Sequence, residues 1–244
     1  MITKQASLRQ HLLFAIAGLF ALLCFDISGL DRPIAEWMLR ITGGTTAIGQ
    51  ANYGFPLRGV AWFELLFHKG LKNSLWLWVL LILINTLNLK QTWAQKLRFN
   101  VPAPAWRVML GLILLIPLFV SLLKSQSLPY CPWDVTGLGG TQPQYEWFDR
   151  LLGLLQSETK NGRCWPAGHA SGGFALLASY AVFRVVKPLW AKPALYAALA
   201  FGIVMGLAQQ FKGAHFMSHT LWTAWFAWVI AIFGTHFCKR WLKL

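Results

Sequence analysis

Two short segments of this chain place a histidine where an apolar run meets more polar sequence. The first is CWPAGH, from Cys164 to His169, and the second is GAHFMSH, from Gly213 to His219. An imidazole titrates near neutral pH and can act as a nucleophile or as a general acid and base. Because a titratable ring in or at the end of a membrane-spanning helix is costly, such histidines are functional candidates. The two segments predict that His169 and His215 form a catalytic pair.

The composition indicates the kind of protein that must position this pair. The chain has 244 residues, of which 56% are hydrophobic and 12% charged, and its mean hydropathy is +0.48. This is too little polar surface to cover a soluble globule of its size. The composition therefore predicts an integral membrane protein.

Apolar runs long enough to cross a bilayer occur six times, since a spanning helix needs about 17 to 25 residues. They cover residues 10–29, 73–89, 107–124, 168–186, 193–211 and 219–238. The first run has a basic start like a secretory signal, but no small-residue cleavage site follows it, and we interpret it as a retained helix. We expect an all-α, polytopic fold with six transmembrane helices, forming a single membrane-embedded domain over residues 1–244.

The charged residues predict the orientation of these helices. If the amino terminus is cytoplasmic, the inner segments are short and carry basic residues only, whereas all eight acidic residues lie outside or at the outer end of the first span. This is the distribution that the positive-inside rule expects, with both termini cytoplasmic. The net charge of +14 is thereby explained by juxtamembrane lysines and arginines, and we expect no nucleic-acid partner.

The two long outer loops contain amphipathic stretches. Residues 31–40 predict a short interfacial helix with Ile34, Trp37 and Met38 on one side. Residues 60–71 group four apolar side chains on one face and end in His68 and Lys69, which suits a helix lying in the headgroup layer. The two stretches could form a lid for a lipid, or they could only anchor the protein at the interface.

His11, His68 and His236 have no motif around them, and we interpret them as interfacial.

Polar residues cluster at the outer ends of three parts of the predicted bundle. The first cluster runs from Lys124 to Asp134, the second from Arg163 to His169, and the third from Gln209 to His219. Independent spans that bring polar groups to one membrane face can assemble one site.

These clusters resemble the motifs of the type 2 phosphatidic acid phosphatase superfamily. The family pattern is Lys-x6-Arg-Pro, then Pro-Ser-Gly-His, then Ser-Arg-x5-His-x3-Asp, and the resemblance covers the six-span plan and the order of all three motifs. The residues that match are Lys124, Pro132, Pro166, Gly168, His169 and His215. The chain departs from the pattern at five positions, with Cys131, Ala167, Ala208, Gln209 and His219 in place of Arg, Ser, Ser, Arg and Asp.

The resemblance implies a role for each matching residue. It implies that His215 is the nucleophile that attacks phosphorus, that His169 is the general acid for the leaving oxygen, and that Lys124 holds the phosphate. Backbone amides around Gly168, at the start of the fourth span, could add donors to the phosphate.

The departures call for substitutes. The loss of two arginines removes two bidentate phosphate ligands, and Arg163 and Lys212, together with Gln209, are the candidates to replace them. His219 cannot act as a carboxylate toward His215, although it can accept a proton from it, and Asp134 is the alternative orienting group.

Cys131 and Cys164 both lie in the second outer loop, beside the first and second motifs. An oxidising compartment would let them form a disulfide, which would tie the two motifs together. Cys24 and Cys238 are expected to be free. We expect no metal, because His215 and His219 lack the intervening Glu and the third ligand of a His-Glu-x-x-His site.

The sequence thus predicts an inner-membrane enzyme whose site faces the periplasm or cell exterior and which removes phosphate from a membrane lipid. We expect no cofactor. Transfer of the phosphoryl group to another lipid, and a non-catalytic lipid-binding or transport role on the same scaffold, remain alternatives. The sequence does not choose the lipid or predict an oligomeric state.

Overall fold

The computed structural model of the chain describes residues 7–87, 100–145 and 162–239. The described residues form helices joined by loops, and among them no strand is present beyond isolated bridges. In chain order the elements are α1 (Leu8–Ile27), α2 (Asp31–Ile41), α3 (Ala61–Phe63), the π-helical segment η1 (Glu64–Gly70), α4 (Leu71–Thr86), α6 (Ala103–Ser125), the 3₁₀ helix η2 (Pro132–Asp134), α8 (Gly168–Phe174), α9 (Leu177–Val186), α10 (Pro188–Phe211) and α11 (Met217–Phe237). The prediction of an all-α fold is confirmed.

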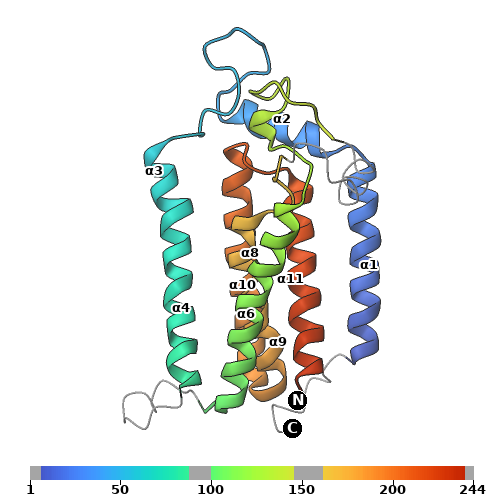
Figure 1. The fold of residues 1–244 in the computed structure, drawn as a ribbon, viewed down its shortest axis with the longest axis vertical. Helices are drawn as coiled ribbons and strands as arrows, with labels where there is room; N and C mark the ends of the chain where they lie inside the picture. The colour runs from blue at the N-terminus through green and yellow to red at the C-terminus, as the bar shows by residue number, and fades with distance from the viewer. Residues whose placement is uncertain (1–6, 88–99, 146–161, 240–244) are drawn as a thin grey trace.

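Five helical segments are long and apolar enough to cross a membrane: Leu8–Ile27, Ala103–Ser125, Gly168–Val186, Pro188–Phe211 and Met217–Phe237. The remaining predicted span corresponds to α4, which has 16 residues and is shorter than these five. Figure 1 shows α4 running alongside the other long helices, at the left of the bundle.

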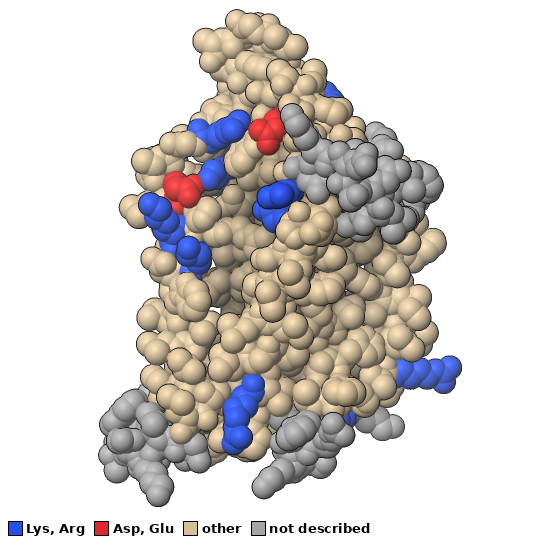
Figure 2. Space-filling view, viewed as in Figure 1, with Lys and Arg blue, Asp and Glu red and all other residues tan. Residues whose placement is uncertain are grey.

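The surface of the bundle agrees with a lipid environment. Large apolar side chains are exposed along α1, α4, α6 and α10, for example Phe14, Leu77, Leu118 and Ile203. In the face shown in Figure 2, lysines, arginines and acids lie toward the two ends, and the middle of the described surface has none. Exposed apolar side chains in such a band are what a bilayer would cover.

The segment formed by α8 and α9 lies at the centre of the bundle. In its 18-residue apolar stretch 67% of the residues are buried, against 22% in α1. It packs against α6, α10 and α11, whereas α1 packs on α11 and α4 on α6 (Figure 1). The contact with α10 depends on small residues: a Cβ on Gly173 would lie 2.6 Å from the Gly202 nitrogen. Close approach of backbones through glycine is a common way to pack membrane helices.

A second, smaller core lies above the bundle in Figure 1. We call α2 together with residues 42–60 and 127–142 the cap. Helix α2 crosses the end of the bundle. The buried apolar side chains there are Ala35, Leu39, Phe55, Val135, Leu138 and Phe216. Phe216 directly follows His215, so the cap packs against the turn that carries this histidine.

The structure confirms a helix at residues 31–40. Ala35, Met38 and Leu39 are buried, whereas Trp37 is 57% exposed. Ala35 and Leu39 belong to the cap core, and the interfacial position of the helix stays a prediction.

The prediction of a separate helix lying in the headgroup layer at residues 60–71 is wrong. α3, η1 and α4 follow one another without a break from Ala61 to Thr86, and Figure 1 shows α3 at the top of the same column as α4. Trp62 and Leu66 are exposed, whereas Phe63 is buried. The polar end of the stretch is directed at the bundle, as described below.

Candidate active site

The segments that carry the first two motifs lie side by side at the cap end of the bundle. The backbone N–H groups of Gly162, Arg163 and Cys164 donate to the carbonyl groups of Leu128, Ser127 and Pro129 at 2.9, 3.0 and 3.0 Å. Cys131 and Cys164 form a disulfide with their Cα atoms 5.2 Å apart. The predicted disulfide is confirmed, and Cys24 and Cys238 are free.

His215 lies in the tight turn between α10 and α11 and is 5% exposed. The turn depends on Gly213, whose φ of +74° is readily adopted by glycine and where a Cβ would lie 2.3 Å from Cδ2 of Phe55. The carbonyl of Gly213 accepts from the Trp133 N–H at 2.9 Å, and the Ala214 N–H donates to the Gln209 carbonyl at 2.8 Å. These bonds fix the nucleophile candidate between the cap and α10.

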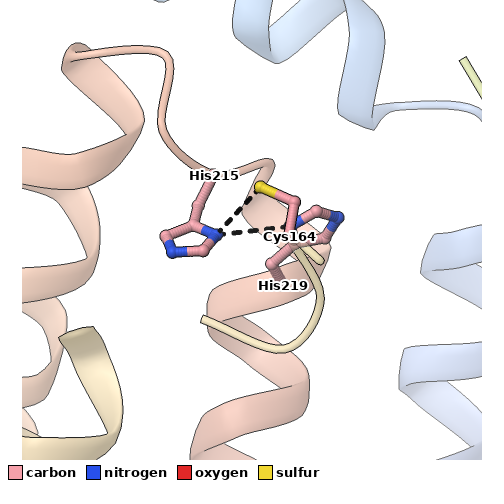
Figure 3. Close-up of side chains that lie close together, drawn as sticks. All are labelled: Cys164, His215 and His219. Atoms are coloured by element: carbon pink, nitrogen blue, oxygen red, sulfur yellow. Dashed lines mark hydrogen bonds between the residues drawn. The ribbon is translucent and has the colours of Figure 1, made fainter. Parts of the chain in front are cut away.

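One edge of the His215 ring is occupied by two neighbours. Its Nδ1 lies 3.4 Å from Nδ1 of His219 and 3.6 Å from Sγ of Cys164, and Figure 3 shows both contacts on the same nitrogen, with the other nitrogen pointing away. The arrangement suits a tautomer in which Nδ1–H donates to His219 and Nε2 carries the lone pair. His219 is thus the ring that contacts Nδ1 of His215, and Nε2 of His215 points away from both neighbours.

Burial determines the charge of the His215 ring. It lowers the pKa of His215 to about 3, and the positive charge of Lys124 acts in the same direction. A ring with this pKa is neutral at pH 7, which is the form that can attack phosphorus.

The start of α11 is held in place by groups from other elements. Both the N–H and the hydroxyl of Ser218 donate to the Asp31 carboxylate, the N–H at 2.8 Å, and the Ala167 N–H donates to the His219 carbonyl at 3.1 Å. A carboxylate is favourable at a helix N-terminus because it accepts free backbone N–H groups. Asp31 therefore links α2 to the helix that carries His219, a role that sequence reasoning missed because the two residues are far apart along the chain.

Lys124 and the second motif meet at the same end of the bundle. Nζ of Lys124 lies 3.7 Å from the position that a Cβ would take on Gly168, so the end of the lysine chain lies beside the start of α8. The charges of Lys124 and His169 both act on His215. The structure therefore brings together four of the predicted residues: Lys124, Gly168, His169 and His215.

The π-helical segment η1 adds residues that the sequence analysis did not place in the site. The His68 ring lies on the His169 ring with centroids 4.2 Å apart, and Nδ1 of His68 lies 3.0 Å from Oε1 of Glu64. Lys212 donates to the other oxygen of Glu64. The interpretation of His68 as simply interfacial is incomplete, because no local motif marks a contact made over a hundred positions in the chain.

Three other predicted residues lie differently. The Asp134 carboxylate accepts from the Trp133 indole at 2.8 Å. Among the described residues this is the one hydrogen bond of the Asp134 side chain. The geometry therefore favours His219 over Asp134 as the orienting group. Arg163 is exposed and has a φ of +52°. Gln209 is 5% exposed, and its amide nitrogen has no hydrogen-bond partner among the described residues.

The side chains of Cys164, His215 and His219 each offer a potential ligand atom, and these atoms lie within 4.8 Å of one another. A metal binds the thiolate form of cysteine, and here the sulfur of Cys164 is bonded to Cys131. This group therefore supplies two histidine nitrogens, fewer than the ligands of a structural zinc site. The prediction of no metal stays a prediction.

Comparison with known families supports the same assignment. The family model described as the PAP2 superfamily matches residues 104–243. The chain belongs to the PAP2 superfamily. No curated protein and no solved structure matches it. Membership of the PAP2 superfamily indicates a phosphatase-type enzyme that acts on phosphate esters.

Some residues of the candidate site lie within the range that matches the PAP2 superfamily, and others lie before it. Lys124, Gly168, His169, His215 and His219 lie within the matched residues. Asp31, Glu64 and His68 lie before them, in α2 and η1. The contacts of these three residues are thus additions to the site from the part of the chain outside the match.

Proposed function

We propose that the protein is a lipid phosphate phosphatase that works through a phosphohistidine on His215. The observation that carries this proposal is the orientation of His215, whose Nδ1 is engaged by His219 while Nε2 points away from it (Figure 3). A neutral ring held in this way is a competent nucleophile. Lys124, whose charge acts on His215, and Lys212, whose charge acts on His169, would neutralise charge on the phosphoryl oxygens.

In the first step, Nε2 of His215 forms a bond to phosphorus as the bond from phosphorus to the lipid oxygen breaks. His169 gives a proton to that oxygen. In the second step, water attacks the phosphohistidine, His169 takes a proton from the water, and the bond between Nε2 and phosphorus breaks. Inorganic phosphate leaves, and both histidines return to their starting states.

The roles of the remaining residues follow from their positions. Lys124 and Lys212 bind phosphate oxygens, and the backbone beside Gly168 and the buried amide of Gln209 add neutral donors. His219 orients His215. Arg163, exposed at the rim, is the weakest member of this set, and Asp134 serves the cap through Trp133.

A membrane lipid is the substrate class that fits the placement of the site. His169 and His215 lie at the ends of apolar helices, so a phosphate in the headgroup layer reaches them while its chain stays in the bilayer. We further propose that the protein lies in the inner membrane with the site on the outer face and both termini in the cytoplasm. The basic ends of α1, α9 and α11, which Figure 1 shows at the end opposite the site, support this orientation.

Phosphate release by the purified protein in lipid nanodiscs tests this function. Substrates are a phosphatidic acid, a polyprenyl diphosphate and a water-soluble phosphomonoester, with His215→Ala as the inactive variant and exposed His236→Ala as the control. We expect release from at least one lipid, lost in His215→Ala and kept in His236→Ala. Release that survives His215→Ala would reject the nucleophile assignment.

Two alternatives give different results in the same assay. Transfer to a second lipid would require His215 but would place the phosphoryl group on an acceptor lipid, with little inorganic phosphate released. A lipid-binding protein without catalysis would release no phosphate from any substrate and would bind lipid equally well after His215→Ala.

A further inference from the structure

The segment η1 contacts His169 through its backbone. Nε2 of His169 lies 3.4 Å from the carbonyl oxygen of Phe67, a long hydrogen bond of the kind that tightens when substrate binds. π-helical turns occur frequently at functional sites. With Nε2–H directed at this carbonyl, the exchangeable proton of His169 resides on Nδ1.

The ring of His169 is also held from the side. The His68 ring stacks on it at 4.2 Å between centroids with a tilt of 38°. This contact and the Phe67 carbonyl fix two independent directions of the His169 ring, its plane and its rotation. A general acid must hold its proton within hydrogen-bond reach of the leaving oxygen, so both contacts bear on catalysis.

Glu64 connects His68 to Lys212, one of the proposed phosphate-binding residues. One oxygen of Glu64 lies 3.0 Å from Nδ1 of His68, and the other accepts from Nζ of Lys212. Lys212 is nearly buried, with 10% of its side chain exposed. The hydrogen bond from Lys212 is the main reason that the pKa of Glu64 lies below its usual value, and the carboxylate is ionised at neutral pH.

Apart from Glu64, the charged groups around the His68 and His169 rings are lysines. The titratable groups that face them are Glu64 and Lys69 of η1, Lys72 of α4, Lys124 of α6, and Lys212 and His215 from the turn after α10. Glu64 is the one acid among these described groups. Its removal would leave the lysines uncompensated beside His169.

We propose that Glu64 and His68 are positioning residues for His169, with Glu64 holding both the His68 ring that packs on His169 and the ammonium group of Lys212 beside it. This inference rests on the proposed function. It assigns a part in catalysis to η1, which lies outside the residues that match the PAP2 superfamily.

The proposal predicts a specific kinetic change. Without the Glu64 carboxylate, the His68 ring and Lys212 both lose the group that holds them, so the His169 ring is less often placed to give its proton to the leaving oxygen. We expect kcat at pH 7 to fall about tenfold. KM changes less than kcat because Lys124 and Lys212 still bind the phosphate.

The experiment compares Glu64→Gln with Glu36→Gln in phosphate release from nanodiscs across pH 5 to pH 9. Glu36 is a matched control, since its side chain is 27% exposed against 31% for Glu64, and it pairs with Arg32 and Arg40 on α2. We expect the loss of kcat in Glu64→Gln alone, and Glu64→Asp should restore most of the wild-type kcat. Identical profiles for Glu64→Gln and Glu36→Gln would overturn the proposal.

A second variant covers the case in which Glu64→Gln fails to fold. His68→Leu is expected to lower kcat about tenfold with KM within about twofold of wild type; an unchanged kcat would contradict the proposal. Other results would reject the proposed function itself, namely an inactive wild type or activity that persists in His215→Ala. Wild-type activity that requires His215 but not Glu64 rejects the present inference alone.

Discussion

His219 stands where the PAP2 pattern has an aspartate, and its ring contacts Nδ1 of His215 at 3.4 Å. A neutral imidazole can accept the Nδ1 hydrogen as a carboxylate does, but it adds no negative charge to a buried site. The nearby acid, Asp31, is instead used to bind Ser218 at the start of α11. At the scale of single residues, the proposed nucleophile His215 is therefore contacted by an imidazole in place of a carboxylate, and burial keeps its own ring neutral.

Replacing His219 tests the orienting role. His219→Leu should lower kcat about 100-fold, because the His215 Nδ1 hydrogen loses its acceptor and the wrong tautomer becomes accessible. His219→Gln should retain more activity, since its amide oxygen can accept the same hydrogen. Steady-state phosphate release measures both, and equal losses in the two variants would show that His219 matters for packing only.

The low pKa of His215 predicts a dependence of stability on pH. The folded-state pKa of about 3 lies below the ordinary value of 6.5, so between these values the unfolded chain binds the proton more readily. The contribution of the neutral ring is full above pH 6.5 and is lost as pH falls toward 3, with a slope of up to about 1.4 kcal/mol per pH unit.

Thermal unfolding in detergent between pH 4 and pH 8 measures this contribution. The wild type should lose more stability than His215→Asn as pH falls, because asparagine does not titrate. Parallel curves for the two proteins would mean that the buried ring does not resist protonation.

Among the elements, the site depends on how closely α8 approaches α10 and on how the disulfide joins two loop segments. Residues 127–131 and 162–164 pair through backbone hydrogen bonds and the Cys131–Cys164 bond. Gly173 and Gly202 let the central helices meet at backbone distance. These contacts hold Lys124, His169 and His215 at one end of the bundle although they belong to separate elements.

Removing the disulfide should destabilise the protein. Cys131→Ser together with Cys164→Ser is expected to cost about 2–4 kcal/mol of unfolding free energy, because the sequence separation of 33 residues makes a long loop to close. Activity should fall as well, since Cys164 adjoins His215. Thermal unfolding checks this against Cys24→Ser together with Cys238→Ser, and equal midpoints for the two variants would contradict it.

Gly173→Ala should lower stability by about 1–3 kcal/mol, since its Cβ would lie 2.6 Å from backbone that cannot move aside. Gly111→Ala is the matched control, because it is also in a spanning helix and a Cβ there meets nothing within 4 Å. Thermal midpoints of the two variants in the same detergent measure the difference. A Gly173→Ala protein as stable as the control would show that the two helices can separate at no cost.

How far the sequence predicts these elements depends on the range of the interactions involved. The limits of the long helices were predicted to within a few residues, because a run of apolar side chains is a local property. The disulfide and the residues of the three motifs could be inferred from their neighbours. Glu64, His68 and Asp31 could not, since the contacts that join them to the rest of the site are made with Lys212, His169 and Ser218, each at least a hundred positions away, and no local pattern marks such contacts.

For the whole molecule, the charge distribution and the position of the cap are the basis of the proposed orientation. The cap, His169, His215 and acids such as Asp31 and Glu64 lie at one end, and the starts of α1 and α10 lie at the other (Figure 1). A substrate phosphate would approach at the water boundary on the cap side. Under the proposed function, the site is thus reached from the headgroup layer on a single face of the membrane.

Cysteine labelling tests this orientation. In a Cys24→Ser, Cys238→Ser background, Ala47→Cys in the cap and Lys192→Cys near the start of α10 both introduce an exposed thiol. We expect an impermeant maleimide to label Ala47→Cys in cells with a permeable outer layer and Lys192→Cys only after the membrane is lysed. The reverse pattern would place the site in the cytoplasm.

The central claim is that phosphorus becomes bonded to Nε2 of His215. Rapid quenching of the protein with a radiolabelled lipid phosphate, followed by peptide mass spectrometry, measures this bond directly. The account predicts an acid-labile, base-stable phosphoryl group on His215, which accumulates in His169→Gln because hydrolysis of the intermediate is slowed, and which is absent from His215→Ala. A phosphoryl group on another residue, or turnover with no trapped intermediate in His169→Gln, would contradict it.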